Sequence, residues 1–472
     1  MSVRPRGGPR LAPCAPGSHR PIQGGATEMA TEPRFDAKKA GIFNPGPDEL
    51  KALAAEMPNA RRTANGNVNV QTRVVARSKS STFIVSDTPG EHTDPCIPRD
   101  EGERIAAMQD HFIQGREMVA VDGYIGNDPS FRVPCRLVIE RSNANIAAMQ
   151  QQLYYTENGV GGPGFEPQLT IIYTPNLKAE GYPNDRVITV DLEAGLTRVL
   201  NSDYFGESKK GGLRMWNKIV YDRGGLALHA GCKVIPVDGR RRVGLIVGLS
   251  GTGKTTTTFT RQNESQPVQD DFVALMPGGK VYATENGCFA KTYGLNPDDE
   301  PVIYSAVTHP GAYLENVAQD EQGRPDFFDD SYTQNGRSTF LLEKTGIAAD
   351  PLAIDHADFL LILNRNDNTI PAVAKLDGAQ AAAFFMLGET RGTSAGGKEE
   401  AGKSLRVPGT NPFFPLLHGL QGTRFLELLQ SSNMDVYLMN TGSIAGDEDD
   451  ERSKKVKIRH SSAIVKAIAE EA

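Results

Sequence analysis

The first indication of fold and chemistry is the segment Val243-Gly244-Leu245-Ile246-Val247 followed by Gly248-Leu249-Ser250-Gly251-Thr252-Gly253-Lys254-Thr255. Its first five residues are typical of a buried strand, and the next eight match the G-x-x-x-x-G-K-[ST] phosphate-binding loop at every fixed position. The glycines let backbone N–H groups turn inward, Lys254 can bind the outer phosphates, and the Thr255 hydroxyl can hold a divalent metal. We therefore predict nucleotide binding. The alternative, a glycine-rich turn that ends in Lys-Thr by chance, is disfavoured by the strand before it.

The composition restricts the class of protein. The chain has 472 residues, a formal net charge of −7 and five cysteines. Without a basic stripe, nucleic acid is not an expected partner, and no apolar run reaches the roughly 18 residues that a membrane span requires. The cysteines are widely separated and form no CxxC pair, so we expect no disulfide framework or zinc ribbon, and we predict a cytoplasmic location.

The chain is long enough for more than one domain. We expect a disordered tail over residues 1–34, an α/β domain on the substrate side over 35–225, and a phosphate-loop domain over 226–472. The expected strands cover residues 118–124, 169–173, 187–192, 226–237, 358–363 and 436–439, and the expected helices cover 104–114, 378–387, 422–429 and 461–471.

Polar residues on both sides of the phosphate loop suggest a metal site. The segment from Asp203 to Gly211 and then His229 precede the loop, and Asp270-Asp271 lies about fifteen residues beyond it, where a phosphoryl-transfer site commonly has its metal-binding aspartate. Singly, each also fits an ordinary structural role: Lys210 as a solvated cation, His229 as a core imidazole, the aspartates as a turn.

Taken in order, the motifs resemble the ATP-type phosphoenolpyruvate carboxykinases over about residues 70 to 470. The matching segments are Ala76-Arg77-Ser78, Tyr204-Phe205-Gly206-Glu207-Ser208-Lys209-Lys210-Gly211, His229, the phosphate loop, Asp270-Asp271, Gly287-Cys288-Phe289-Ala290-Lys291-Thr292, Leu314-Glu315-Asn316-Val317, Asn335-Gly336-Arg337 and Asn440-Thr441-Gly442. The Tyr204 and Gly287 segments are much more specific than the phosphate loop, which many nucleotide enzymes share.

This resemblance implies a mixed α/β, two-domain carboxykinase-like fold, with the phosphate loop in the C-terminal domain and the active-site cleft between the domains. The implied reaction, a step of gluconeogenesis, decarboxylates oxaloacetate and phosphorylates the resulting enolate with ATP. Its products are phosphoenolpyruvate, CO2 and ADP.

The resemblance also implies roles for individual residues. Lys210, as a neutral amine, His229 and Asp271 would hold Mn²⁺, and Thr255 would hold the Mg²⁺ that accompanies ATP. Arg77, Tyr204, Lys210, Lys254 and Arg337 would bind the substrate or the transferred phosphoryl group. The implied nucleotide-binding residues are Gly248, Ser250, Gly251, Thr252, Gly253, Lys254, Thr255, Thr256, Lys291, Glu300 and Arg391.

Departures from the family pattern leave alternatives open. Phe272 follows the aspartate pair where an acidic residue is usual. Residues 392–397 replace a longer base-binding segment, so the nucleotide is ATP or another. The competing functions are a kinase of the same fold that phosphorylates a hydroxyl group, and a nucleotide-binding protein without turnover. A hydroxyl acceptor needs a positioned base and has no dicarboxylate for the arginines to bind. The oligomeric state stays open.

Overall fold

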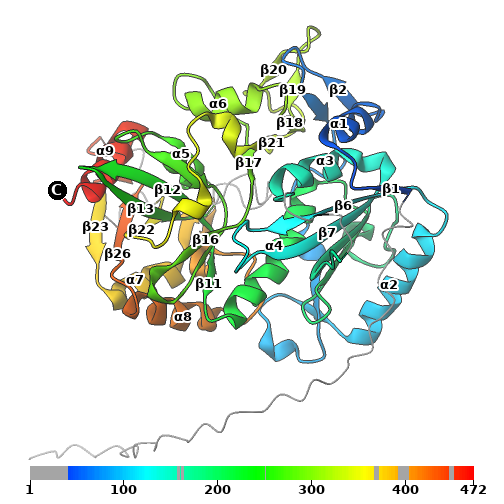
Figure 1. Cartoon of the computed structure of the whole chain (residues 1–472), viewed down its shortest axis with the longest axis horizontal. Coiled ribbons are helices and arrows are strands. Elements are labelled where there is room, and N and C mark those ends of the chain that lie inside the picture. Colours follow the sequence, from blue (N-terminus) through cyan, green and yellow to red (C-terminus); the bar gives the residue numbers. More distant parts are fainter. Residues whose placement is uncertain are drawn as a thin grey trace, which may run out of the picture. The chain divides into compact units, whose positions relative to one another are not determined.

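Two large β-sheets organise the part of the chain that this computed structural model describes: residues 41–156, 160, 164–249, 251–365, 371–391, 403–445 and 451–472, with Thr390 and Arg391 described by their backbone alone (Figure 1). Both sheets lie in the unit formed by residues 37–472. With helices packed on them, they confirm the predicted mixed α/β class. The expected tail over residues 1–34 falls outside the described residues.

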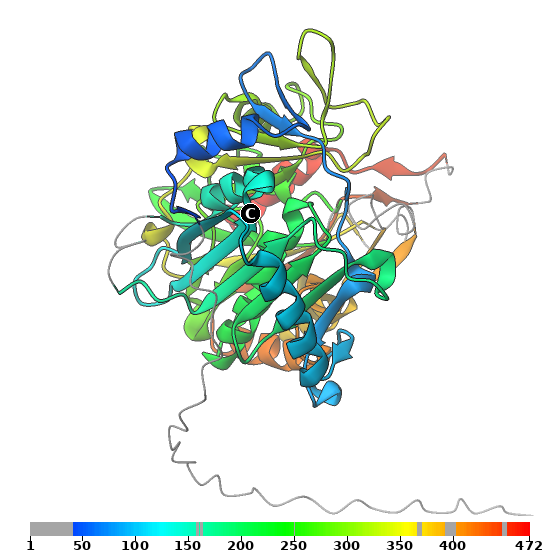
Figure 2. The same ribbon diagram turned by 90° about the vertical axis from the view of Figure 1, so that its right-hand side faces the viewer.

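The first sheet has eight strands, in the order β1 (Gly41–Phe43), β6 (Met118–Ile125), β7 (Val133–Glu140), β8 (Leu169–Thr174), β10 (Leu196–Leu200), β9 (Val187–Asp191), β4 (Thr82–Val85) and β5 (Cys96–Ile97). Side chains alternate between its faces. On β10, Thr197 contacts Gly211 of α4 (Phe205–Asp222), whereas Arg198 binds Asp110 of α2 (Arg99–Ile113). Helix α3 (Ala144–Leu153) packs beside α4. Figure 2 shows α2 on the opposite face.

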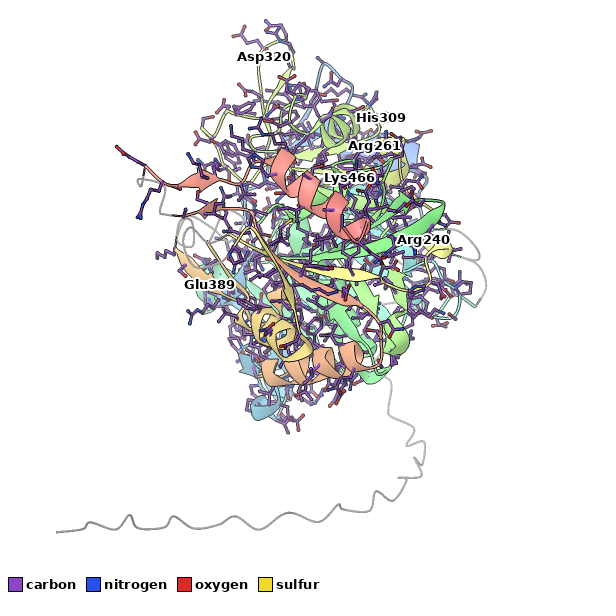
Figure 3. All side chains as sticks on the ribbon, turned by 90° about the vertical axis from the view of Figure 1, so that its left-hand side faces the viewer. Arg240, Arg261, His309, Asp320, Glu389 and Lys466 are labelled. Atoms are coloured by element: carbon purple, nitrogen blue, oxygen red, sulfur yellow. The ribbon has the colours of Figure 1, made fainter. Side chains whose placement is uncertain are left out.

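The second sheet has six strands, in the order β14 (Gln266–Gln269), β12 (Ala230–Val237), β13 (Arg240–Val247), β22 (Phe359–Asn364), β26 (Asp435–Asn440) and β23 (Val373–Leu376). Leu360 of β22 packs in the apolar layer shared with α7 (Gly378–Leu387) and α8 (His418–Gln430). The next residue, Leu361, packs against α9 (Ile458–Ala469) on the other face. Figure 3 shows α9 over this face, with the exposed Lys466 labelled.

Two smaller sheets connect distant segments. The five-stranded sheet has the order β17 (Gly287–Lys291), β21 (Arg337–Leu341), β18 (Tyr313–Glu315), β3 (Val68–Val70) and β2 (Ala60–Arg62), and the three-stranded sheet has the order β11 (Leu226–Leu228), β15 (Val273–Leu275) and β16 (Val281–Ala283). Because β3 pairs with β18, the five-stranded sheet combines strands from both sides of the boundary expected at residue 225. That boundary and the cleft that depends on it stay predictions.

The remaining elements are α1 (Pro47–Ala55), α5 (Lys254–Phe259), α6 (Pro301–Thr308), β19 (Ala318–Gln319), β20 (Pro325–Asp326), β24 (Glu389–Arg391), β25 (Ser404–Arg406), β27 (Ser443–Ile444) and β28 (Lys454–Lys455). Among the described residues, no helix combines the length and the apolar character needed to cross a bilayer.

The expected strands and helices are present, α7 with its expected bounds and the others with shifted ends, but the run over residues 226–237 divides at His229. The residues before His229 pair with β15, and those after it pair with β13 and β14, so the chain changes sheet there. Helix α4 was not predicted. Its glycines disfavour a helix by propensity, yet a Cβ at Gly211 would lie 2.9 Å from Cγ2 of Thr197. The close contact between helix and sheet therefore requires glycine at this position.

Candidate active site

The phosphate loop joins β13 to α5. Gly251 and Gly253 have φ angles of 87° and 90°, in the left-handed region that favours glycine. The Thr252 hydroxyl donates to the Leu249 carbonyl oxygen at 2.8 Å and closes the loop. Ser250, a predicted nucleotide contact, falls outside the described residues. The glycine conformations suit a loop whose N–H groups surround a phosphate.

A buried lysine, Lys233, binds the C-terminal end of α5. Nζ of Lys233, on β12, donates to the carbonyl oxygens of Thr257 at 3.0 Å and Thr260 at 2.6 Å, and to Oε1 of Gln262 at 2.7 Å. These bonds fix the C-terminal end of the helix that begins with Lys254. No motif contains Lys233, so sequence reasoning had no signal for this role.

The carboxylate of Asp271, just after β14, is the centre of a buried charged cluster. Nζ of Lys210 lies 2.5 Å and Nζ of Lys209 2.9 Å from its Oδ2. On the other side, Nζ of Lys254 and Nε2 of His229 each lie 2.9 Å from Oδ1. The structure thus brings the three predicted manganese ligands together beside the phosphate-loop lysine.

The charges in this cluster shift one another's pKa values. Burial opposes ionisation of Asp271, but Lys209, Lys210 and Lys254 outweigh it and hold its pKa well below the usual range. Burial also acts to lower the pKa of Lys209, but Asp271 and Glu285, 2.8 Å away, raise it above normal. For Lys210, burial prevails over Asp271 and, with Lys209, lowers the pKa to about 7. Lys210 is therefore more easily deprotonated than its neighbour Lys209.

The geometry around His229 fits a metal ion. Its Nδ1 lies 3.0 Å from the Thr410 carbonyl oxygen, which accepts only, so Nδ1 carries the proton. Burial, with Lys254 as the next cause, lowers the pKa of His229 to about 4, so the ring is neutral near pH 7. Its Nε2 lone pair then faces Oδ1 of Asp271, and two acceptors 2.9 Å apart need a cation between them.

Nε2 of His229, a carboxylate oxygen of Asp271 and the neutral amine of Lys210 form a nitrogen and oxygen donor set compatible with Mn²⁺. Within the described part of the chain, no three His, Cys, Asp or Glu side chains cluster as metal ligands. The third donor here is a lysine.

A second pair of oxygens suits Mg²⁺. Asp270 is buried, which raises its pKa, whereas the neighbouring hydroxyl of Thr255 acts to lower it. Its Oδ1 has no hydrogen-bond partner among the described residues. Magnesium prefers such oxygen ligands together with phosphate oxygens. Sequence analysis singled out the aspartate pair but gave Asp270 no role.

The predicted substrate residues Tyr204 and Arg337 meet at Asn335. The Asn335 amide donates to the Tyr204 hydroxyl at 3.2 Å, and its Oδ1 accepts from Nη2 of Arg337 at 2.8 Å. Burial raises the pKa of Tyr204, so its hydroxyl stays protonated. Lys291 lies opposite Arg337 in the β17–β21 register, and burial, with Arg337, lowers its pKa to about 8.

Arg77 and Lys210 both contact the aromatic ring of Phe413. Its guanidinium carbon lies 5.0 Å from the centroid of Phe413, and Nζ of Lys210 lies 4.5 Å from that centroid. The rings of Phe413 and His229 are 6.1 Å apart. Phe413 therefore links Arg77 to the metal-ligand candidates. Sequence analysis missed Phe413 because it lies far along the chain from every motif.

A cavity of about 140 Å³ adjoins the phosphate loop and α5. Its lining includes Gly253, Thr256, Gln262, Arg365, Thr441, Val456, Ser461 and Ser462. Glu300, a predicted nucleotide residue, accepts from the Thr256 hydroxyl at 2.6 Å. Arg391, the predicted base contact, lies on β24 opposite Ser404, but its side chain is outside the description. Its contact with the base stays a prediction.

Comparison with known proteins gives consistent matches. The family model described as phosphoenolpyruvate carboxykinase matches residues 39–472. A relative from Aeropyrum pernix is 35% identical over 358 residues, covering 73% of this chain and 70% of its own. Relatives from a Bradyrhizobium species and from Nitrobacter hamburgensis are each 30% identical and cover 87% and 90% of this chain, and 79% and 81% of their own lengths. All three are named phosphoenolpyruvate carboxykinase (ATP).

Proposed function

The chain belongs to the phosphoenolpyruvate carboxykinase (ATP) family, and we propose that it converts oxaloacetate and ATP into phosphoenolpyruvate, CO2 and ADP. One observation supports this reaction most directly: Lys210, His229 and the phosphate-loop Lys254 all contact the carboxylate of Asp271. A phosphate group on the loop then lies beside the site where an enolate would form. The cytoplasmic location stays a prediction.

The phosphate loop and Lys254 bind the nucleotide tail in this proposal. The backbone N–H groups between Gly251 and Lys254 would hold the phosphates, and the Lys254 ammonium group would neutralise charge on the transferred phosphoryl group. To reach a bound phosphate, Lys254 would turn away from Asp271, which it contacts at 2.9 Å. Lys233 holds the other end of α5 during this change.

The metal ligands in this proposal are Lys210, His229 and Asp271 for Mn²⁺, and Thr255 with Asp270 for Mg²⁺. Bound Mn²⁺ supplies positive charge for the enolate oxygen as it develops. Lys209 is tied to both Asp271 and Glu285, so it holds Asp271 in place without occupying the metal position. Lys210 would bind the metal as the neutral amine, whose lone pair is free only when the proton is absent.

Arg77, Tyr204 and Arg337 orient the dicarboxylate. A guanidinium group binds a carboxylate through two parallel hydrogen bonds, which fixes the plane of the substrate. Nε of Arg337 is buried without a partner among the described residues, so it has a donor left for a ligand. The contact of Asn335 with both Arg337 and Tyr204 holds these two side chains at a fixed spacing.

The cavity beside α5 is the proposed site of the nucleobase. It adjoins Gly253 and Thr256, so a nucleotide whose phosphates lie on the loop reaches it with its base. Val456 offers an apolar surface to the ring, and hydroxyl and amide groups of Gln262, Ser461 and Ser462 offer hydrogen bonds. Glu300, held by Thr256, lies where the ribose hydroxyls would pass.

One assay tests the reaction and its alternatives. Purified protein with oxaloacetate, ATP, Mg²⁺ and Mn²⁺ should form phosphoenolpyruvate, and parallel reactions with GTP give the nucleotide preference. ATP turnover with hydroxyl acceptors, unaffected by oxaloacetate, would establish the kinase alternative instead. Nucleotide binding without turnover under every condition would leave only a binding protein.

A further inference from the structure

Arg214 is a buried guanidinium group that no motif contains. It lies on α4, one helical turn after Lys210, and its residue is 5% exposed. Its guanidinium carbon is 5.4 Å from the centroid of Phe413. Both Nε and Nη1 are buried with no hydrogen-bond partner among the described residues. At least two donors of a permanent cation are therefore unused.

Such a group is costly unless something binds it. Desolvating a charged donor without an acceptor is unfavourable, and a cation–π contact offsets only part of that cost. No ion pair of Arg214 is found within the described part of the chain. The same ring is approached by the cation of Arg77, which adds repulsion. These facts indicate that the guanidinium group of Arg214 binds an anionic ligand from solution.

The position of Arg214 indicates which anion. Arg214 shares the ring of Phe413 with Arg77, a predicted substrate residue, and with Lys210, a predicted metal ligand. Arg214 is thus beside the residues expected to bind the substrate. A planar guanidinium fork fits a planar carboxylate.

We propose that Arg214 binds a carboxylate group of the dicarboxylate substrate, next to Arg77 and against the ring of Phe413. This inference rests on the proposed carboxykinase function and adds a residue that selects for the second carboxylate. A ligand with one carboxylate leaves one guanidinium unpaired and buried, so it binds weakly. Arg214 therefore favours dicarboxylates over monocarboxylates.

The test compares Arg214→Met, which removes the charge, with Arg214→Lys, which keeps the charge but loses the two-point fork. The matched control is Arg223→Met at the end of the same helix, where Arg223 lies 4.9 Å from the ring of Phe131 and donates to its carbonyl oxygen. Steady-state assays give the KM for oxaloacetate and for ATP, and the inhibition constants of succinate and acetate against oxaloacetate. Near-UV circular dichroism checks the fold of each variant.

We expect Arg214→Met to raise the KM for oxaloacetate and the inhibition constant of succinate at least tenfold, with the KM for ATP within twofold of the parent value. Arg214→Lys should raise the KM for oxaloacetate and the inhibition constant of succinate about threefold or more. The inhibition constant of acetate should not change in either variant. If Arg214→Met does not fold, Arg214→Lys carries the test.

Unchanged values for oxaloacetate and succinate in the folded variants would overturn the inference. An equal rise in the Arg223→Met control would assign the effect to helix packing and overturn it too. If the parent enzyme forms no phosphoenolpyruvate, the proposed function is wrong. If the parent is active and the Arg214 variants are unaffected, only this inference is wrong.

Discussion

The cluster around Asp271 and the cavity beside α5 both adjoin the phosphate loop, but they differ in chemistry. In the cluster, three lysines and a histidine surround one buried carboxylate, at 2.5 to 2.9 Å. The cavity is lined mainly by hydroxyl, amide and apolar groups. Buried charges respond strongly to any change, because the surroundings screen them poorly. We therefore expect changes in the cluster to alter the reaction, and changes in the cavity to alter nucleotide affinity alone.

The largest expected effect comes from Lys254→Met. The methionine keeps the length of the side chain but removes the charge from the transferred phosphoryl group, so kcat should fall by about 10³-fold or more. Phosphoenolpyruvate formation measures this loss. Titration with adenosine, which has no phosphates, provides the control because its binding in the cavity should be unaffected. Retained kcat would mean that the loop lysine does not act on the phosphoryl group.

Asp271→Asn should have the next largest effect. An amide of the same shape is a poor metal ligand and leaves three lysines without their shared counter-charge. We expect Mn²⁺ affinity to fall about 100-fold, measured by electron paramagnetic resonance of free Mn²⁺, and unfolding free energy to fall by about 3 kcal/mol. The exposed Asp298→Asn variant is the control. Parent-like Mn²⁺ binding in Asp271→Asn would remove the cluster as the metal site.

The pH dependence of Mn²⁺ binding sharpens the role of Lys210. Its pKa is lowered to about 7 in the folded protein, so below pH 7 a proton occupies the lone pair that the metal needs. His229, with a pKa of about 4, adds no proton in this range. Apparent Mn²⁺ affinity should therefore fall about tenfold from pH 8 to pH 6 and level off above pH 8. A flat profile between pH 6 and pH 8 contradicts lysine ligation.

The smallest expected effect is in the cavity. Gln262 accepts from Lys233 and donates to the Ser462 hydroxyl at 3.1 Å, so its amide orientation is fixed. Gln262→Ala should raise the KM for ATP about fivefold, the value of one hydrogen bond, and leave kcat and the KM for oxaloacetate unchanged. Asn263→Ala is the control, because Asn263 contacts Glu470 at the surface. A fall in kcat would show that the two regions are not independent.

Much of the fold followed from periodicity and composition. Strands such as β6, β8 and β22 are apolar runs bounded by turn residues, and α7 has the bounds that its sequence predicts. Helix α4 was not predicted because helix propensity depends on local conformation alone. The low propensity of Gly211 is offset by its close contact with Thr197 of a neighbouring strand, which only the tertiary structure shows. The change of sheet at His229 was not predicted for a similar reason. The local sequence of a strand does not show which sheet the strand will join.

The amino-acid sequence alone determined the phosphate loop, because the loop is one continuous segment whose glycines and lysine act through their own backbone geometry. The family motifs likewise named Lys210, His229 and Asp271. Only the tertiary structure decided that Lys233 would hold α5, that Phe413 would join Arg77 to Lys210, and that Arg214 would be buried without a partner. These features depend on side chains from distant segments meeting in space, and the free energy of a buried charge depends on everything around it.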